Sequence, residues 1–471
     1  MSKKTLMILF MIIIFPIATN LACLSSSKSI VAEKIEEMSS EDTETEEVVE
    51  EAATEEPQAA TEEPEVVVVE PTAAQIQEMQ QDISMEQSFW TQDQSTVFVA
   101  YLFRNPNTSF VIENINLDFY LLDAYGSELG HDWYDLSLIQ PEQEFAVVFT
   151  YYLSSDQDVV DSISVNWETT MAPVSNALSQ PIVANQINFW DNDGYPLVTG
   201  SIINANEFIY KYIQLNIVCF GPTGNIVGGS HEYIDFVPEY NEFGFSSYIQ
   251  TFGDVATTKI FPVLTSSTEE IPFENQWTDI AIVDDHFYQG NYGWAYGGAV
   301  IYNNTSQSIE NSIFQATFYD SNGRVISSAY DYIDFIFPGE QLGIVPWTYN
   351  IPDGSSISHY DIWILPGEPV TNYELSENPF QVTSLGLVGD YDDTVSVTFT
   401  NTYNKQASEV DVYVLLRNSN GEIIGGGYDW TSEATPAGGS TTIEVWVTYY
   451  SDEIIDEIEA WVVPNYWTEF D

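Results

Sequence analysis

The chain has 471 residues, of which 72 are Asp or Glu and only 10 are Lys or Arg, giving a formal net charge of -62. Binding to nucleic acid and electrostatic docking on an anionic membrane both need clustered Lys and Arg, so this balance argues against both. Hydrophobic residues make up 44% of the chain and aromatic residues 14%, a composition that can fill packed cores and that favours strands.

The N-terminus has the pattern of an export signal. Two lysines precede an apolar run over residues 5–18, which is short for a membrane span and suited to the hydrophobic region of a signal peptide. The run leads to Cys23 and a serine tail, which resembles a bacterial lipoprotein cleavage site, although Asn20 stands where that pattern prefers Leu. We predict a signal peptide over 1–22 and lipid on Cys23, which anchors the exported chain to the membrane on its extracytoplasmic side. Plain secretion and an uncleaved anchor helix are the alternatives.

Residues 23–85 are rich in Glu, Thr, Ala and Pro. Such a stretch cannot bury enough apolar surface to offset its ordering entropy, and its like charges extend it. We predict a disordered acidic linker, in which residues 73–83 could form a short helix. The linker would act as a spacer or simply as a solvated tail.

Beyond the linker the chain repeats itself about every 98 residues. A turn glycine recurs at this period, with an asparagine that ends a strand-like run about twenty residues before it and a proline 14 or 15 residues after it. The glycines are Gly126, Gly224, Gly323 and Gly421; the asparagines are Asn105, Asn204, Asn303 and Asn401; the prolines are Pro141, Pro238, Pro338 and Pro436. Because these markers agree on one period, we predict four repeats. Their ranges are 86–175, 182–270, 277–370 and 379–471.

Each repeat has the pattern of a series of short strands. Residues 395–399 alternate apolar and polar side chains, which is typical of a strand between a core and water. Asp, Asn and Gly at the marker turns favour tight hairpins. The sequence therefore predicts an all-β fold of four tandem immunoglobulin-like β-sandwich domains, each closing a separate hydrophobic interior. Cys23 and Cys219 cannot form a disulfide framework, and Cys219 falls at a core position where it would act as a small hydrophobe.

The run into the first marker turn resembles a known family. Residues 119–123 read Phe-Tyr-Leu-Leu-Asp, which is similar to the motif of the FxLYD family except that Leu122 replaces the Tyr. Residues 318–320 of the third repeat keep Phe-Tyr-Asp, with Ala316 in place of the leading Phe. The family consists of small β-sandwich modules of bacterial and archaeal extracytoplasmic proteins. The resemblance implies an extracytoplasmic module with an undefined binding role and no catalytic residues.

The residue types that carry catalysis are not arranged for it. His131 and His231 align with Tyr330 and Tyr428, so this position is predicted to be strand surface rather than a catalytic base. The many acids are predicted to be solvated rather than paired in a cleft, and the spacing of Cys and His gives no zinc site. We predict that the chain is not an enzyme; an exported hydrolase is a remote alternative.

Two acidic segments begin like calcium-binding loops. Residues 191–194 read Asp-Asn-Asp-Gly and residues 390–393 read Asp-Tyr-Asp-Asp, but the distal Glu of the full loop is missing. We predict no cofactor and no metal site. The alternative to solvated turns is a loosely held Ca²⁺ that stiffens the array.

Aromatic residues beside the aligned acids are the candidates for binding. One occupies the same position in every repeat, and together they could form a stripe that binds a protein or glycan partner, or could simply pack. They are Trp133, Tyr233, Tyr332 and Trp430. We expect a non-catalytic cell-surface lipoprotein whose modules form a structural or protein-interaction array. The alternative is a carbohydrate-binding surface protein that uses aromatic strand faces.

Overall fold

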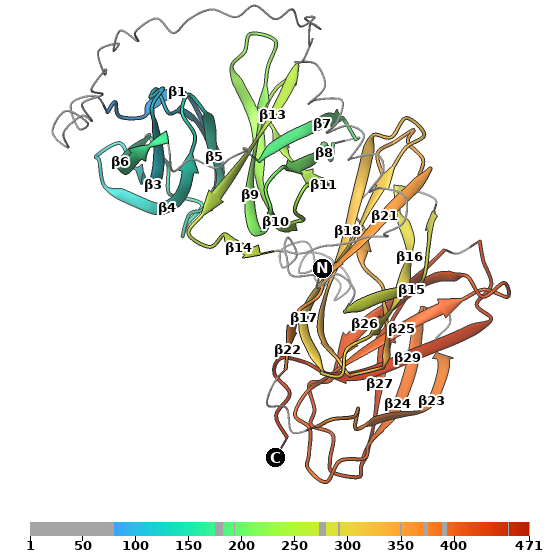
Figure 1. Cartoon of the computed structure of the whole chain (residues 1–471). Coiled ribbons are helices and arrows are strands. Elements are labelled where there is room, and N and C mark those ends of the chain that lie inside the picture. Colours follow the sequence, from blue (N-terminus) through green and yellow to red (C-terminus); the bar gives the residue numbers. More distant parts are fainter. Residues whose placement is uncertain are drawn as a thin grey trace, which may run out of the picture. The chain divides into compact units, whose positions relative to one another are not determined.

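A computed structural model describes residues 80–174, 182–192, 194–272, 279–290, 293–348, 351–370, 375–388, 393–450 and 452–470. Throughout these ranges the chain folds into antiparallel strands, β1 to β29, which confirms the predicted all-β fold (Figure 1). The predicted signal peptide, Cys23 and most of the acidic linker lie outside the described residues. Residues 80–83, the end of the segment that could form a helix, are neither helix nor strand, and β1 begins two residues before the expected start of the first repeat.

The strands fall into four sets along the chain, which we call modules 1 to 4. Module 1 comprises β1 (Ser84–Asp93), β2 (Thr96–Arg104), β3 (Phe110–Leu122), β4 (Glu128–Ile139), β5 (Glu144–Tyr152) and β6 (Ser162–Pro173). Module 2 comprises β7 (Val183–Trp190), β8 (Leu197–Asn204), β9 (Phe208–Phe220), β10 (Ile226–Val237), β11 (Asn241–Tyr248), β12 (Gln250–Thr251), β13 (Thr257–Thr265) and β14 (Glu269–Pro272).

Modules 3 and 4 follow the same plan. Module 3 comprises β15 (Ile280–Gln289), β16 (Ala295–Asn303), β17 (Ile309–Tyr319), β18 (Val325–Ile336), β19 (Gln341–Ile344), β20 (Trp347–Thr348), β21 (His359–Leu365) and β22 (Glu368–Pro369). Module 4 comprises β23 (Phe380–Val388), β24 (Thr394–Asn401), β25 (Val410–Arg417), β26 (Ile423–Trp430), β27 (Ser440–Trp446), β28 (Thr448–Tyr449) and β29 (Glu457–Pro464).

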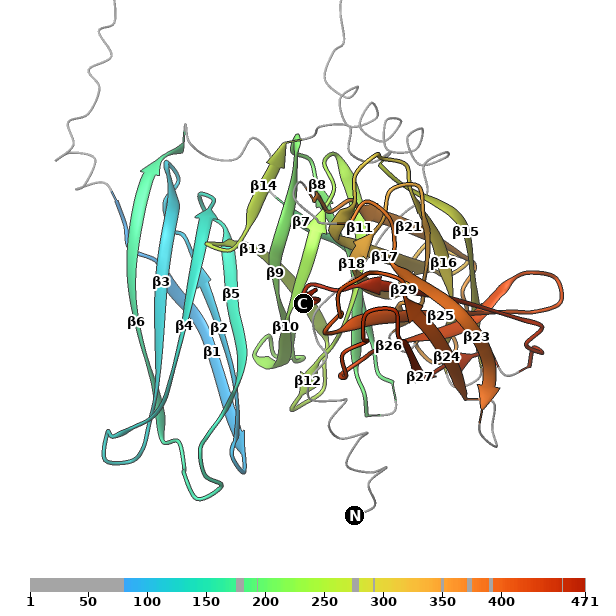
Figure 2. The same cartoon turned by 90° about the horizontal axis from the view of Figure 1, so that it is seen from below.

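Each module packs a small sheet against a larger one. The small sheets are β1-β2-β5, β7-β8-β11, β15-β16-β19 and β23-β24-β27, and the larger sheets are built around β3, β9, β17 and β25. In module 1, visible in Figure 2, the core combines Phe103 and Phe149 of the small sheet with Leu117 and Phe119 of the larger one. Alternate side chains of each strand therefore meet between two layers, as in a β-sandwich.

The predicted marker turns are hairpins between the first two long strands of each larger sheet. Gly126, Gly224, Gly323 and Gly421 have φ values of 79°, 81°, 75° and 81°. This left-handed conformation suits glycine because it lacks a Cβ atom. In the first turn, the Asp123 carboxylate accepts hydrogen bonds from the N–H groups of Tyr125 and Ser127, at 2.8 and 2.7 Å. The turn chemistry read from the sequence is confirmed.

The recurring asparagine holds together three parts of each module. Asn204 is completely buried, and its Nδ2 group donates to the carbonyl oxygens of Phe208, Val237 and Pro238, at 2.8, 3.2 and 3.0 Å. Its Oδ1 atom accepts the N–H of Asn206 at 3.0 Å. The three remaining marker asparagines are equally buried and bond in the same way. The side chain thus replaces water for backbone groups where a strand leaves the sheet.

Inner strands of the array are buried on both faces. Strand β2 is buried from Val97 to Phe103, whereas the corresponding strand β24 of module 4 alternates buried and partly exposed residues. In the larger sheets the pattern of burial is the opposite. Strand β25 of module 4 is buried throughout, whereas β3 of module 1 alternates buried residues with partly or fully exposed ones over most of its length. A strand with two apolar faces needs a partner on each side. The small sheet of each of modules 1 to 3 therefore packs against the next module. The larger sheet of each of modules 2 to 4 packs against the preceding module.

Apolar contacts fill these seams between modules. At the seam of modules 1 and 2, Phe98 and Leu102 form one buried cluster with Val218 and Phe220. At the seam of modules 3 and 4, Val300 packs with Leu415 and Ile423. Strand β13 also pairs with β4 over two residues, which joins the larger sheets of modules 1 and 2.

The expectation of a separate interior for every repeat is wrong for modules 2 and 3. Their buried residues form a single cluster that runs from Ile182 to Leu365 and includes Tyr413 and Val463 of module 4. The described residues from Ile83 onward belong to one compact unit. The reason is that the outward faces of the inner strands are apolar or small, so neighbouring sheets pack closely instead of facing water.

Candidate interaction surfaces

The four predicted aromatic positions do not form one equivalent stripe. Trp133 and Trp430 are 64% and 54% exposed, whereas Tyr233 and Tyr332 are 39% and 37% exposed. The last two lie at the seams between modules. Trp133 and Trp430 therefore remain candidates for binding a partner, whereas Tyr233 and Tyr332 are less accessible.

Acids of the preceding module influence both seam tyrosines. The Tyr332 hydroxyl donates to Asp235, which is buried, at 2.7 Å. Burial raises the pKa of Tyr233, and the carboxylate of Asp132 raises it further. At these two positions the aromatic ring is better explained by contact between neighbouring modules than by ligand binding.

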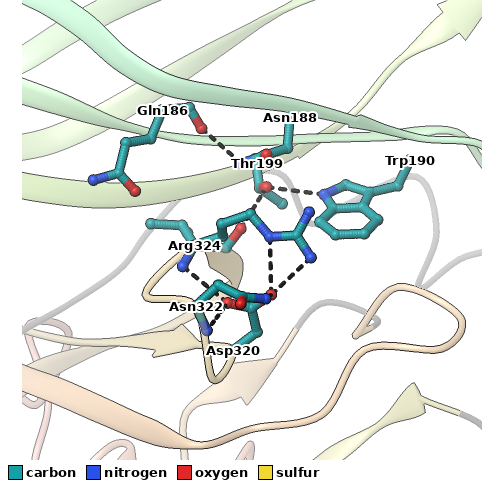
Figure 3. A network of polar contacts seen from close by, with 8 residues as sticks. Gln186, Asn188, Trp190, Thr199, Asp320, Asn322 and Arg324 are labelled. Atoms are coloured by element: carbon teal, nitrogen blue, oxygen red, sulfur yellow. Dashed lines mark hydrogen bonds and ion pairs between the residues drawn. The ribbon is translucent and has the colours of Figure 1, made fainter.

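A polar network joins modules 2 and 3 at the third marker turn (Figure 3). Trp190 Nε1 donates to Thr199 Oγ1 at 3.0 Å, and that hydroxyl donates to the carbonyl oxygen of Val325 at 2.7 Å. The guanidinium of Arg324 lies 5.1 Å from the centroid of the Trp190 ring and pairs with Asp320 at 2.7 Å. Although burial opposes it, hydrogen bonds from Arg324 hold the pKa of Asp320 at about 2. This cation–π and ion-pair arrangement fixes the turn against module 2.

Three carboxylates meet at the seam of modules 3 and 4. Asp411 of β25 is completely buried, and its Oδ1 atom accepts hydrogen bonds from Tyr428 Oη and Asn465 Nδ2, at 3.1 and 3.0 Å. Its Oδ2 atom is buried with no hydrogen-bond partner. Burial and, to a lesser degree, the carboxylate of Asp334 together raise the pKa of Asp411 to about 7. Burial also raises the pKa of Asp331 well above its ordinary value. Asp331 lies close enough to Asp411 for the Asp411 carboxylate to raise that pKa further.

Sequence reasoning did not single out this carboxylate cluster. The available signal was one acid, Asp411, in a strand whose other residues up to Leu416 are apolar. Its neighbours Asp331 and Asp334 come from module 3, so only the packing of two modules brings the three together.

A buried arginine crosses the same seam. Arg417 donates from Nη1 to Asp284 of module 3, and from Nε to Glu459 of module 4 at 2.9 Å. The neighbouring carboxylates raise its pKa against the effect of burial. A largely buried guanidinium between two carboxylates is costly to break by removing one partner.

The remaining reactive side chains have structural surroundings. His131 is exposed, stacks on Tyr120 at 4.5 Å and lies 2.9 Å from a carboxylate oxygen of Asp118. Cys219 is completely buried in the core, as predicted, and burial raises the pKa of its thiol to about 11. A thiol with a raised pKa is a poor nucleophile.

Of the two segments with calcium-loop character, residues 193 and 390–392 lie outside the described residues. Among the residues that are described, no group of three or more His, Cys, Asp or Glu side chains is placed to hold a metal ion. Nowhere in the described part of the chain does a helix have the length and apolar character needed to cross a bilayer.

Comparisons with known proteins assign no family. No family model matches the chain, and no curated protein matches it. Among the solved structures it is similar to is one described as "The structure of a beta-glucuronidase from glycoside hydrolase family 2". The identity is 8% and the TM-score 0.13, over 76% of this chain and 32% of that chain. The chain thus spans about a third of that protein, and a score of this size carries no argument about fold or function.

Proposed function

We propose that this chain is a non-catalytic, exported lipoprotein whose β-sandwich modules form a stacked structural or interaction array outside the membrane. The observation that carries the proposal is the pattern of strand burial. Strand β2 of module 1 is buried on both faces, whereas β24 of module 4 keeps Ser396, Thr398 and Thr400 partly exposed. The inner faces of the array thus bind neighbouring modules, and its terminal faces are polar, as in repeat proteins with capping ends.

Stacking can be tested by small-angle scattering of residues 80–471 as a function of salt. With a formal net charge of -62 on the whole chain, independent modules would repel and spread apart at low ionic strength. A stacked array should keep one radius of gyration between about 20 mM and 500 mM salt. A radius that shrinks steadily as salt is added would contradict stacking.

Lipid attachment can be tested separately. In a bacterial host, radiolabelled palmitate should be incorporated into the wild-type chain and not into Cys23→Ser. Cys219→Ser is the control, because that thiol is buried in a core and should leave labelling unchanged. Equal labelling of the wild type and Cys23→Ser would contradict lipid attachment at Cys23.

The second candidate is a carbohydrate-binding surface protein, which the exposed rings of Trp133 and Trp430 favour. Such rings can stack on sugars. A glycan array with the wild type, Trp133→Ala and Trp430→Ala tests it: binding that either substitution abolishes would support this function over a purely structural one.

A further inference from the structure

Four exposed aromatic side chains gather on module 4, beside its seam with module 3. We call them the aromatic cluster: Tyr428, Trp430, Tyr466 and Trp467, which are 43%, 54%, 70% and 69% exposed. The rings of Tyr428 and Trp430 lie 6.2 Å apart, and those of Tyr466 and Trp467 lie 5.0 Å apart, edge to face. Modules 1 to 3 have one exposed aromatic side chain at the aligned position, so the cluster distinguishes module 4.

The segment that carries Tyr466 and Trp467 is fixed by hydrogen bonds. The N–H of Asn465 donates to Thr468 Oγ1 at 2.8 Å, and the N–H of Trp467 donates to Asn465 Oδ1 at 2.9 Å. Asn465 Nδ2 donates to Asp411, and the N–H of Tyr466 donates to Asp334 at 3.3 Å. Two exposed rings held in this way lose little conformational freedom when a ligand binds.

The carboxylates beside the cluster lack positive partners. Cross-strand pairing places Asp411 opposite Trp430, on the same face of the sheet, and Asp411 also accepts the hydroxyl proton of Tyr428. Asp331 and Asp334 lie close by, and no ion pair of the described residues involves any of the three acids. The buried Oδ2 atom of Asp411 remains unpartnered. Because Asp411 is completely buried, the carboxylate that an outside ligand can approach is that of Asp334, which is partly exposed and accepts the N–H of Tyr466. A carboxylate next to electron-rich rings is an environment that attracts a cation.

We infer that the aromatic cluster binds an organic cation, the guanidinium or ammonium group of a basic polypeptide, beside the carboxylate of Asp334. A bare metal ion fits less well, because the described residues place no set of three ligands together. A polypeptide is favoured because the net charge of -62 steers basic partners toward the chain. The inference rests on the proposed interaction array and names the chemistry of one partner site.

The test is a binding titration with a blocked peptide that contains two arginines and with the same peptide carrying citrulline, which is neutral and almost isosteric. Titration calorimetry at about 0.3 M salt reduces non-specific attraction to the acidic surface. The arginine peptide should bind, and Trp430→Ala and Trp467→Ala should each weaken it by about fivefold. Asp334→Asn should weaken it by about tenfold. Tyr125→Ala, on module 1 and 94% exposed, is the control for loss of an exposed ring and should change nothing.

Several results would overturn the inference. Equal binding of the arginine and citrulline peptides would show that charge is not recognised. Equal losses in Tyr125→Ala and Trp467→Ala would show that the surface is not specific to module 4. Cellohexaose binding that needs Trp467, without binding of the arginine peptide, would identify a sugar site instead. None of these outcomes alters the scattering test of the stacked array, so the two proposals fail separately.

Discussion

At the scale of single residues, the recurring asparagine explains how modules of different sequence keep the same backbone conformation at the end of the second strand. Asn204 binds three carbonyl oxygens and one N–H group with one side chain. Asn204→Ala leaves these buried groups without partners, and we expect it to reduce the free energy of unfolding by about 3 kcal/mol. Asn166→Ala, in the exposed part of β6, should change it by less than about 0.5 kcal/mol. Urea denaturation of both variants measures the difference, and similar losses would contradict the structural role.

Asp411 is the residue through which pH should act on the seam of modules 3 and 4. Its pKa is raised by burial to about 7, so the folded chain holds a proton that the unfolded chain releases near pH 4. The stabilising contribution is therefore complete below about pH 4 and is lost as the pH rises through 7.

Asp411→Asn imitates the protonated side chain and should remove the part of this dependence that Asp411 contributes, whereas Asp331 and Asp334, whose pKa values burial also raises, still titrate. Relative to the wild type we expect little change at pH 4.5, and at pH 8 a stabilisation on the order of 2 kcal/mol. Denaturation at a series of pH values measures it, with Asp156→Asn, which is exposed, as the control. A wild-type excess in stability at pH 8 would show that the charged carboxylate is favoured.

At the scale of strands, aligned positions in different modules have opposite surroundings. Leu102 of β2 is buried in the seam of modules 1 and 2, whereas Thr398 of β24, three residues before the corresponding asparagine, is partly exposed. Leu102→Glu places an unpaired charge in an apolar contact and should destabilise the chain by more than about 3 kcal/mol. Thr398→Glu should cost less than about 1 kcal/mol. Thermal unfolding compares the two, and equal costs would contradict the two-sided burial of β2.

The same strands show what the sequence could and could not predict. The turn at Gly126 and the end of a strand at Asn105 follow from local chemistry, so the repeat predicted both; the burial of the Asn105 side chain and its bonds to the backbone were not predicted. The continuous apolar run of residues 97–103 is typical of a strand with two buried faces, in contrast to the alternation over residues 395–399, so the packing of module 1 on another module is within reach of the sequence. The carboxylate cluster could not be predicted, because Asp331 and Asp411 are brought together only by packing between modules.

At the scale of the whole molecule, the two terminal faces should keep the array from growing. On the outward face of module 4, Thr398 and Thr442 bond to each other through their hydroxyl groups at 2.8 Å, as do Thr400 and Ser440 at 2.7 Å. The corresponding faces of modules 1 to 3 are covered by the next module. Glu444 of β27 is also exposed on the outward face of module 4, opposite Ser396. The combined substitutions Thr398→Val, Thr442→Val and Glu444→Val replace the charged residue and the central threonine pair of this last face by apolar side chains. We expect the wild type to stay monomeric and this variant to self-associate as concentration rises.

Sedimentation velocity measures both. The control is Thr398→Ser with Thr442→Ser, which keeps the face polar and should behave like the wild type. A triple variant that stays monomeric at every concentration would show that polar side chains are not what ends the array, and that the shape of the outer sheet of module 4 must already differ from the inner faces.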